Sequence, residues 1–261
     1  MPKVNGVGFG QSTPIKIQHL TKILDMHLAI TRAVLNKHAI YKKKYRYVDL
    51  TAGKGHTPDG LKGSPLVFLE TIESKYSDLT YRADFVECEA VNLDELKIAI
   101  QREALSQCWA GRDIYFHLGQ YQQQIADILD QRDAGELGLA FVDHSGDPPD
   151  FEALHEIAAL RPRMEILVYL SATNIKRLYQ HTHKLLSDFM DVVGKEHWLI
   201  RKPFSWDRHE WTFLLGSNSG LFKDYKTIGF WQIESEPAQE YFAKLNLTSK
   251  QRQEKLQPPL L

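Results

Sequence analysis

A loop with small residues follows the first short apolar run of the chain, and it is the first candidate for chemistry. Its sequence over residues 48–56 is VDLTAGKGH, and its small residues are Ala52, Gly53 and Gly55. Small residues let the backbone approach a ligand closely, and glycines tolerate a positive φ. An acid, Glu87, ends the next apolar run, 38 positions after Asp49. A carboxylate at that place can accept hydrogen bonds from both hydroxyls of a ribose.

Two common nucleotide-binding patterns are missing here. The phosphate loop needs Gly-Lys followed by Ser or Thr after a strand, and the dinucleotide pattern GxGxxG fails because the segment 53–55 continues as His-Thr-Pro. A D-x-x-A-G-x-G loop with an acid closing the second strand is the pattern of S-adenosylmethionine sites. The expected cofactor residues are Asp49, Ala52, Gly53, Gly55 and Glu87. The alternative is a tight strand-to-helix turn beside an acid that faces water.

Two later turns are expected to complete the site. Gln120 and Tyr121 follow the third apolar run, where the Gln120 amide oxygen can accept from an adenine amino group and Tyr121 can stack. Gln120 can equally serve only to cap the next helix. Asp143, His144 and Ser145 follow the fourth run, and we expect them to face the methyl acceptor, with His144 able to titrate near neutrality. The alternative there is a turn of solvent-facing polar groups.

The segment 147–150, Asp-Pro-Pro-Asp, is similar to the [DNS]PP[YFW] motif of amino-methyltransferases, but we interpret it as a decoy. The motif would have to begin directly after the fourth apolar run, at Asp143, and this segment begins four residues later. Its fourth residue is an aspartate, which cannot stack on a base as the aromatic residue of the motif does. Ser171, Asn174 and Arg177 follow the fifth apolar run and are expected to line the same cleft. Arg177 is also compatible with a plain surface charge on a helix.

A basic and aromatic stretch near the C-terminus includes Arg201, Lys202 and Trp206. Cations interleaved with aromatic rings suit phosphates and unstacked bases, so these residues are expected to bind substrate. Acids interrupt the stretch, and a partner-facing or ordinary surface is the alternative. His181 and His183 do not form a metal pair, because side chains two positions apart on a helix point in different directions. No metal site is expected.

These residues must be positioned by a fold in which strands and helices alternate. The expected strands are 45–50, 81–87, 113–118, 138–143 and 165–171, and the expected helices are 17–42, 64–74, 93–105, 121–131, 151–159 and 175–191. Alternation of this kind predicts a doubly wound, Rossmann-like α/β fold with a mostly parallel sheet. Apolar stretches at 211–215 and 227–233 predict an antiparallel hairpin at the sheet edge.

The composition sets broad limits. Residues 1–16 are expected to be a flexible leader, 17–249 a single domain whose part 195–249 carries the edge hairpin and a possible substrate or partner surface, and 250–261 a loose tail. The 32 basic and 33 acidic residues give no overall basic field for nucleic acid. Two cysteines without a CxxC pair, no signal-like segment and no long apolar run predict a cytoplasmic protein without a membrane span.

Several segments together resemble the three-Cys-motif partner (TcmP) family between Leu20 and Arg177. They are VDLTAGKG, GSPL at 63–66, DFVECEAVNLDELK, FVDHSG and YLSATNIKR. The resemblance implies a class I methyltransferase fold, with the loop at Asp49 lining the methionine end of S-adenosylmethionine and Glu87 holding its ribose. Two positions depart from the family pattern. Lys54 replaces a proline, and His144 with Ser145 replaces a proline–aromatic pair.

Three hypotheses about function follow. The first is an S-adenosylmethionine-dependent methyltransferase, with nucleic acid preferred as the acceptor. The second, which the resemblance implies, is a non-catalytic partner or regulatory protein of a phage-linked or mobile-element-linked system, bound to a three-cysteine protein. The third is a metal-dependent nuclease that uses Asp143, Asp147 and Glu152.

Overall fold

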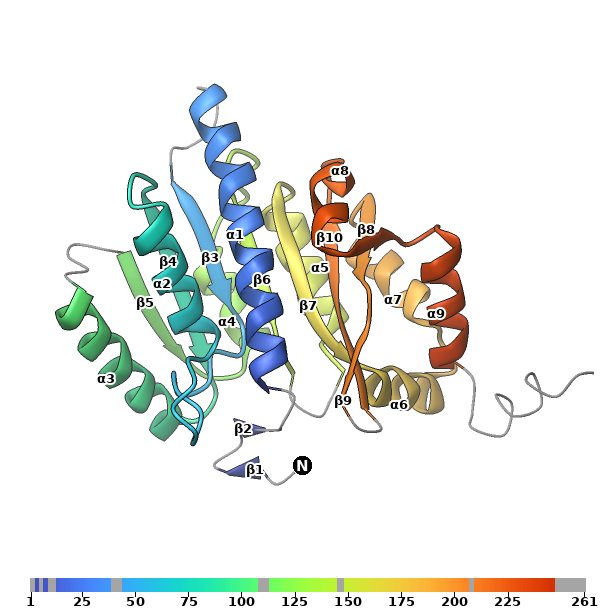
Figure 1. Ribbon diagram of the computed structural model, residues 1–261, viewed down its shortest axis with the longest axis horizontal. Coiled ribbons are helices and arrows are strands. Elements are labelled where there is room, and N and C mark those ends of the chain that lie inside the picture. The colour runs from blue at the N-terminus through green and yellow to red at the C-terminus, as the bar shows by residue number, and fades with distance from the viewer. Residues whose placement is uncertain are drawn as a thin grey trace, which may run out of the picture.

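A central β-sheet with helices on both faces dominates the computed structural model (Figure 1). The structure describes residues 3–4, 7–8, 13–38, 44–107, 113–144, 148–206 and 209–246. The strands of the sheet are β3 (Tyr45–Asp49), β4 (Tyr81–Glu87), β5 (Asp113–Leu118), β6 (Leu137–Val142), β7 (Met164–Ser171), β8 (His197–Arg201), β9 (Phe204–Trp206), β10 (His209–Ser217) and β11 (Phe230–Gln232). A separate antiparallel pair joins β1 (Lys3–Val4) to β2 (Val7–Gly8).

The order of strands shows that the chain winds outward in both directions from β3. The sheet runs β11-β8-β10-β7-β6-β3-β4-β5, with β9 paired to β10. Strands β3 to β7 are mutually parallel, and β10 is antiparallel to β7, β8 and β9. The doubly wound Rossmann-like fold is therefore confirmed, and so is the presence of antiparallel strands toward one edge.

The pairing of those antiparallel strands differs from the expected hairpin. Strand β10 does not pair with β11. It lies between β7 and β8, and β11 pairs with β8 at the edge. The sequence analysis missed β8, because its apolar centre of Trp198, Leu199 and Ile200 is too short for a clear periodicity.

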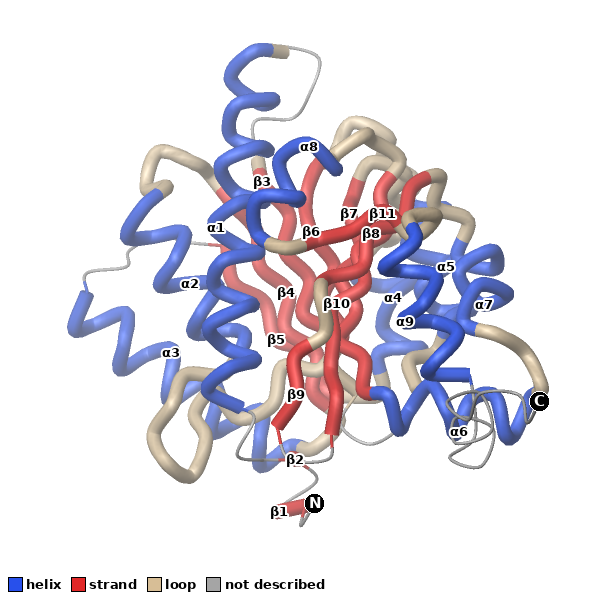
Figure 2. Tube along the Cα trace, turned by 45° about the vertical axis from the view of Figure 1, so that its right-hand side comes forward, coloured by secondary structure: helices blue, strands red, loops and turns tan. Residues whose placement is uncertain are grey.

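Helices cover both faces of the sheet (Figures 1 and 2). They are α1 (Thr13–Lys37), α2 (Ser64–Lys75), α3 (Ala90–Gln107), α4 (Tyr121–Ile128), α5 (Phe151–Leu160), α6 (Ala172–Thr182), α7 (Leu186–Val193), α8 (Phe222–Tyr225) and α9 (Glu236–Asn246), with a 3-10 turn at Lys226–Ile228. One buried cluster lies under α1, α2 and α3, and the second lies on the opposite face under α4, α5, α7 and α9. No helix in the described part of the chain is both long and apolar enough to cross a membrane.

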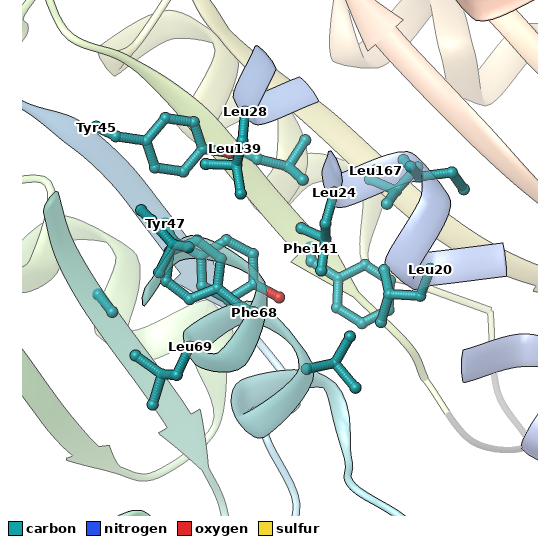
Figure 3. Packing of buried hydrophobic residues seen from close by; sticks show 14 of the residues in the cluster. Leu20, Leu24, Leu28, Tyr45, Tyr47, Phe68, Leu69, Leu139, Phe141 and Leu167 are labelled. Carbon is teal, nitrogen blue, oxygen red and sulfur yellow. The ribbon is translucent and has the colours of Figure 1, made fainter. Parts of the chain in front are cut away.

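The first cluster explains how α1 is fixed to the sheet (Figure 3). Leu20, Leu24 and Leu28 recur at four-residue steps, so they form one stripe, and all are buried. Beside this stripe, Tyr47 of β3 stacks on Phe68 of α2 with ring centroids 3.9 Å apart. Full burial of one such side chain contributes about 2 kcal/mol.

Helix α1 begins earlier than the sequence analysis expected. Its first residue is Thr13, so residues 13–16 belong to the helix and not to a flexible leader. The expected loose tail at 250–261 lies outside the described residues. The earlier start matters because it places Lys16 on α1, next to the carboxyl ends of the parallel strands.

Candidate functional site

The loops that follow the parallel strands meet at one edge of the sheet, at the lower end of Figure 1. Backbone hydrogen bonds connect them: the Ala52 amide donates to the Val86 carbonyl at 2.9 Å, and the Gly119 amide donates to the Glu87 carbonyl at 3.0 Å. The Asp143 amide donates to Thr51 Oγ1 at 2.8 Å. Because the carboxyl ends of parallel strands are where open α/β sheets bind ligands, this edge is the candidate site.

Glu87 closes the glycine loop. The Gly53 amide donates to Glu87 Oε2 at 2.9 Å, and the Glu89 amide donates to Oε1 at 2.9 Å. The side chain of Asn92 contacts the same Oε1 at 3.4 Å. Glu87 is only 8% exposed, so the alternative of an acid that simply faces water is wrong. Each carboxylate oxygen can accept two hydrogen bonds, which leaves Oε2 able to accept one more.

Positions 53 and 55 of the loop require glycine for different reasons. Gly53 has φ of +66°, and a Cβ built on it would meet nothing within 4 Å. Gly55 has φ of +88°, but its Cβ would lie 2.9 Å from the Cβ of Ala99 and 3.3 Å from Leu96 Cδ1 on α3. Gly53 therefore borders open space, whereas Gly55 is required where the loop packs closely against α3. A methionine-lining role for Gly55 stays a prediction.

Asp49 lies beneath this loop and is fully buried. The Thr51 amide donates to Asp49 Oδ1 at 3.2 Å, and the Tyr47 hydroxyl donates to Oδ2 at 3.4 Å. Burial raises the pKa of Asp49 to about 7, against hydrogen bonds from Ser64 and Thr51 that favour the charged form. Ala52 is also buried. Both side chains thus shape the loop from inside, and their assignment to the cofactor site stays a prediction.

Asp143 has an ion-pair partner that sequence analysis missed. The Lys16 ammonium lies 2.5 Å from Asp143 Oδ2, and the two side chains are 19% and 13% exposed. The same ammonium is 5.1 Å from the centroid of the Tyr169 ring. No spacing rule connects residues 127 positions apart. The only available signal was helical periodicity extending before residue 17, which would have placed Lys16 on α1.

His144 and Tyr121 pack against each other after β6 and β5. Their ring centroids are 5.7 Å apart in an edge-on arrangement. The Asp150 amide donates to the Tyr121 hydroxyl at 2.7 Å, and burial raises the pKa of Tyr121 to about 12. Tyr121 is only 3% exposed, so it holds the loop after β6, and its predicted stacking on adenine has no exposed ring face in this conformation. Ser145 lies outside the described residues.

The remaining predicted residues end or follow strands β5, β6 and β7. Gln120 is exposed at the N-cap position of α4 and makes no side-chain cap, so the capping alternative is not realised. Asp150 accepts a hydrogen bond from the Ala153 amide at 3.1 Å and caps α5, which explains the second aspartate of the Asp-Pro-Pro-Asp decoy. Ser171 ends β7 opposite Trp211. Asn174 and Arg177 lie on α6, and their side chains are not described.

The basic and aromatic stretch lies at β8 and β9. Arg201 ends β8, lies 6.0 Å from the centroid of the Phe204 ring and has its pKa lowered by burial. Lys202 is exposed, and the side chain of Trp206 is not described. Substrate binding by these residues stays a prediction.

The described residues contain no cluster of three or more His, Cys, Asp or Glu side chains that could hold a metal ion. Asp147, the second carboxylate of the nuclease hypothesis, lies outside them.

No family model and no curated protein matches this sequence, so TcmP membership stays a prediction. Among solved structures, protein LPL1258 from Legionella pneumophila str. Philadelphia 1, a DUF519 protein, has a TM-score of 0.51 at 12% identity over 88% of this chain and 91% of that one. An arsenic(III) S-adenosylmethionine methyltransferase from Chlamydomonas reinhardtii has a TM-score of 0.46 at 11% identity, covering 75% and 72% of the two chains. The human methyltransferase 10 domain containing protein has a TM-score of 0.43 at 12% identity, covering 82% and 85%. At such identities the first of these similarities establishes a shared fold alone, and the TM-scores of the other two are too low to carry an argument.

Proposed function

We propose that this protein binds S-adenosylmethionine at the carboxyl edge of the sheet and transfers its methyl group to an acceptor that reaches Asp143. The observation that carries the proposal is the hydrogen bond from the Gly53 amide to Glu87. It joins a glycine loop after the first strand to an acid at the end of the second, in a fold that binds ligands at this place.

The residues at this edge fit the proposed cofactor. Open space above Gly53 leaves room for a ligand to contact the backbone. Glu87 Oε2 keeps an acceptor position for a ribose hydroxyl beside the hydrogen bond from Gly53. When bound, the cofactor supplies an electrophilic methyl group. The sulfonium of the cofactor is cationic, and the carboxyl groups of Glu87 and Asp143 lie at the same edge of the sheet.

The acceptor side is built around Asp143. Its carboxylate lies beside the Lys16 ammonium, with Oδ2 and Nζ 2.5 Å apart. A carboxylate can accept a hydrogen bond from an acceptor N–H or O–H and so orient that atom for attack. Alignment of the acceptor and exclusion of water then provide most of the rate acceleration expected from such a site.

Calorimetric titration with S-adenosylmethionine and with its demethylated product tests the cofactor. We expect binding to the wild type and to Asp143→Ala, and loss of binding in Gly53→Val, whose side chain would fill the open space. Gly60→Val is the matched control, because Gly60 also has a positive φ, +78°, and no neighbour within 4 Å of a Cβ. No heat with the wild type, or equal loss in both glycine variants, would contradict the proposal.

The non-catalytic alternative has one specific observation in its favour. Asp143 is already paired with Lys16, and the turn that follows it lacks the usual proline–aromatic pair. Transfer of a tritiated methyl group to DNA, RNA or protein separates the two functions. Transfer to nucleic acid supports the methyltransferase with the preferred acceptor. Intact cofactor binding without transfer to any acceptor supports a regulatory protein, for which a three-cysteine partner and a phage-linked setting are the proposed context.

A further inference from the structure

Exposed apolar side chains are concentrated at one end of the molecule. Seven large apolar side chains are exposed among the described residues, and α3 carries three of them while β5 carries two. On α3 they are Val91, Ile98 and Leu105, which are 61%, 49% and 78% exposed. Both figures in which the fold is drawn place α3 at the outer side of the sheet, beside α2 (Figures 1 and 2). Exposed apolar groups gathered on one surface, unlike scattered ones, indicate a contact with another molecule.

The three residues of α3 form a stripe that faces away from the sheet. They are spaced by seven residues, which is close to two helical turns. The inner face of the helix is occupied by Leu93, Leu96 and Ile100, which are buried. The stripe therefore lies opposite the core, and we call Val91, Ile98 and Leu105 the α3 stripe.

Charges beside the α3 stripe identify what would cover it. Glu95 and Arg102 are both exposed, are seven residues apart, and therefore lie on the same side of the stripe. If a second α3 packs antiparallel with Ile98 at the centre, Val91 of each copy faces Leu105 of the other. Glu95 of each copy then lies within about one residue rise, about 1.5 Å, of the level of Arg102 of the other, so two opposite-charge contacts can form. A parallel arrangement would instead place like residues side by side.

We propose that the α3 stripe is a self-association surface, on which a second copy of this chain packs antiparallel. One helix pair buries less surface than a standard interface, so the dimer is expected to be weak, with a dissociation constant on the order of micromolar. Glu95 also forms an ion pair with Lys54 of the glycine loop, with Nζ and Oε2 3.5 Å apart. Because the two helices run in opposite directions, the two candidate cofactor sites would lie at opposite ends of the interface.

Sedimentation velocity and light scattering over about 1 to 500 μM protein test the proposal. The wild type should shift from monomer to dimer within that range. Ile98→Asp places a charge at the centre of the stripe and should raise the dissociation constant about 30-fold or more. Leu185→Asp is the matched control, because Leu185 is 41% exposed at the N-cap of α7 and an aspartate is favourable there. It should dimerise like the wild type.

Mixing two charge variants makes the test specific for the antiparallel arrangement. Glu95→Lys alone and Arg102→Glu alone each place like charges opposite each other in a homodimer, so each should dimerise more weakly than the wild type. In an equimolar mixture, the heterodimer has two attractive pairs and should recover wild-type association. A wild type that stays monomeric throughout the range, an Ile98→Asp variant that still dimerises, or a mixture that does not recover would each overturn the proposal. Circular dichroism confirms that each variant is folded, and none of these outcomes depends on whether the protein binds S-adenosylmethionine.

Discussion

The two ends of the parallel sheet hold their buried charges in different ways. At the amino end, side chains pair with side chains: Arg161 Nε lies 2.5 Å from Glu136 Oε2, and His27 Nε2 lies 3.1 Å from Glu165 Oε2. At the carboxyl end, Glu87 accepts hydrogen bonds from two backbone amides of the loops. Asp49 accepts from one backbone amide, that of Thr51, and from the hydroxyls of Tyr47 and Ser64. The amino end thus joins elements through contacts between side chains, whereas the carboxyl end uses acids to fix the shape of loops.

Because of this difference, the acids at the two ends are expected to differ in their effects on the free energy of unfolding and on ligand binding. A carboxylate whose two oxygens both lie beside cationic side chains, as those of Glu136 do, has little capacity for a new partner, and its main effect is on the free energy of unfolding. A carboxylate held by backbone amides fixes the loop and keeps an acceptor position toward a ligand. We therefore expect substitutions at the amino end to change stability alone, and substitutions at the carboxyl end to change both properties.

The largest effect on stability is expected at the amino end. Glu136→Ala removes the partner of the buried Arg161 and should lower the free energy of unfolding by about 3 kcal/mol, because an unpaired buried charge remains. Urea denaturation measures this loss, and cofactor affinity should stay within about twofold of the wild type, because Glu136 lies at the end of the sheet away from the candidate site. Asp78→Ala is the control. It breaks an exposed pair with Arg32 and should cost less than about 1 kcal/mol. If both variants lost the same free energy of unfolding, the buried pair at the amino end would contribute no more to stability than an exposed one, which would contradict this prediction.

A pH-dependent effect is expected from Asp49. Its folded pKa of about 7 lies above its unfolded value, so folding favours the protonated form. The stabilisation is complete below the unfolded pKa and is lost as pH rises toward 7, by on the order of 1 kcal/mol per pH unit. Asp49→Asn keeps the shape but cannot ionise. Urea denaturation between pH 5 and pH 8 should show wild-type stability falling relative to this variant up to about pH 7, and then a constant difference. A constant difference over the whole range would show that Asp49 has an ordinary pKa.

A combined effect on stability and binding is expected from Glu87→Gln. In the native protein the two carboxylate oxygens of Glu87 accept hydrogen bonds from the amides of Gly53 and Glu89. A glutamine has only one such oxygen, so one of these amide donors would face its NH2 group. The cost should be about 1 to 2 kcal/mol in stability and about tenfold in S-adenosylmethionine affinity. Thermal unfolding and calorimetric titration measure the two effects. A loss of stability without a loss of affinity would place Glu87 with the structural acids of the amino end.

The smallest effect on stability is expected from Lys16→Met. The pair with Asp143 is partly exposed, so its removal should cost less than about 1 kcal/mol. Methyl transfer, measured as kcat, should fall while the affinity for S-adenosylmethionine stays within about twofold, because Asp143 loses the cation that fixes it on the acceptor side. Lys22→Met changes an exposed lysine of the same helix and should alter neither quantity. An unchanged kcat in Lys16→Met would remove Lys16 from the proposed site.

The sequence predicted the parallel part of the sheet well, because buried parallel strands are nearly continuous apolar runs. Strands β3, β4 and β5 were located to within one residue, and the acids that end β3 and β4 were recognised. Strand β8 was missed because a buried stretch of three residues has no usable periodicity. Its omission led to the wrong pairing for β10, since sequence neighbours were assumed to be neighbours in the sheet.

The site was predicted less completely because its contacts are long-range. The residue types around Gly53 pointed to a close approach of backbone and ligand, and the structure places that glycine next to open space. The same pattern could not distinguish Gly55, whose constraint comes from Ala99 on α3. Nor could it show that Lys16 reaches Asp143, because that contact depends on how α1 packs across the sheet.

Helix α1 connects the two ends of the sheet as a single rigid body. Lys16 contacts Asp143 near the start of the helix, and His27 contacts Glu165 about 16 Å further along its axis. A helix resists axial compression, so a slide of one residue rise, about 1.5 Å, would lengthen both contacts together. The length of α1 thus sets the spacing between a residue of the candidate site and a residue at the opposite end of the sheet.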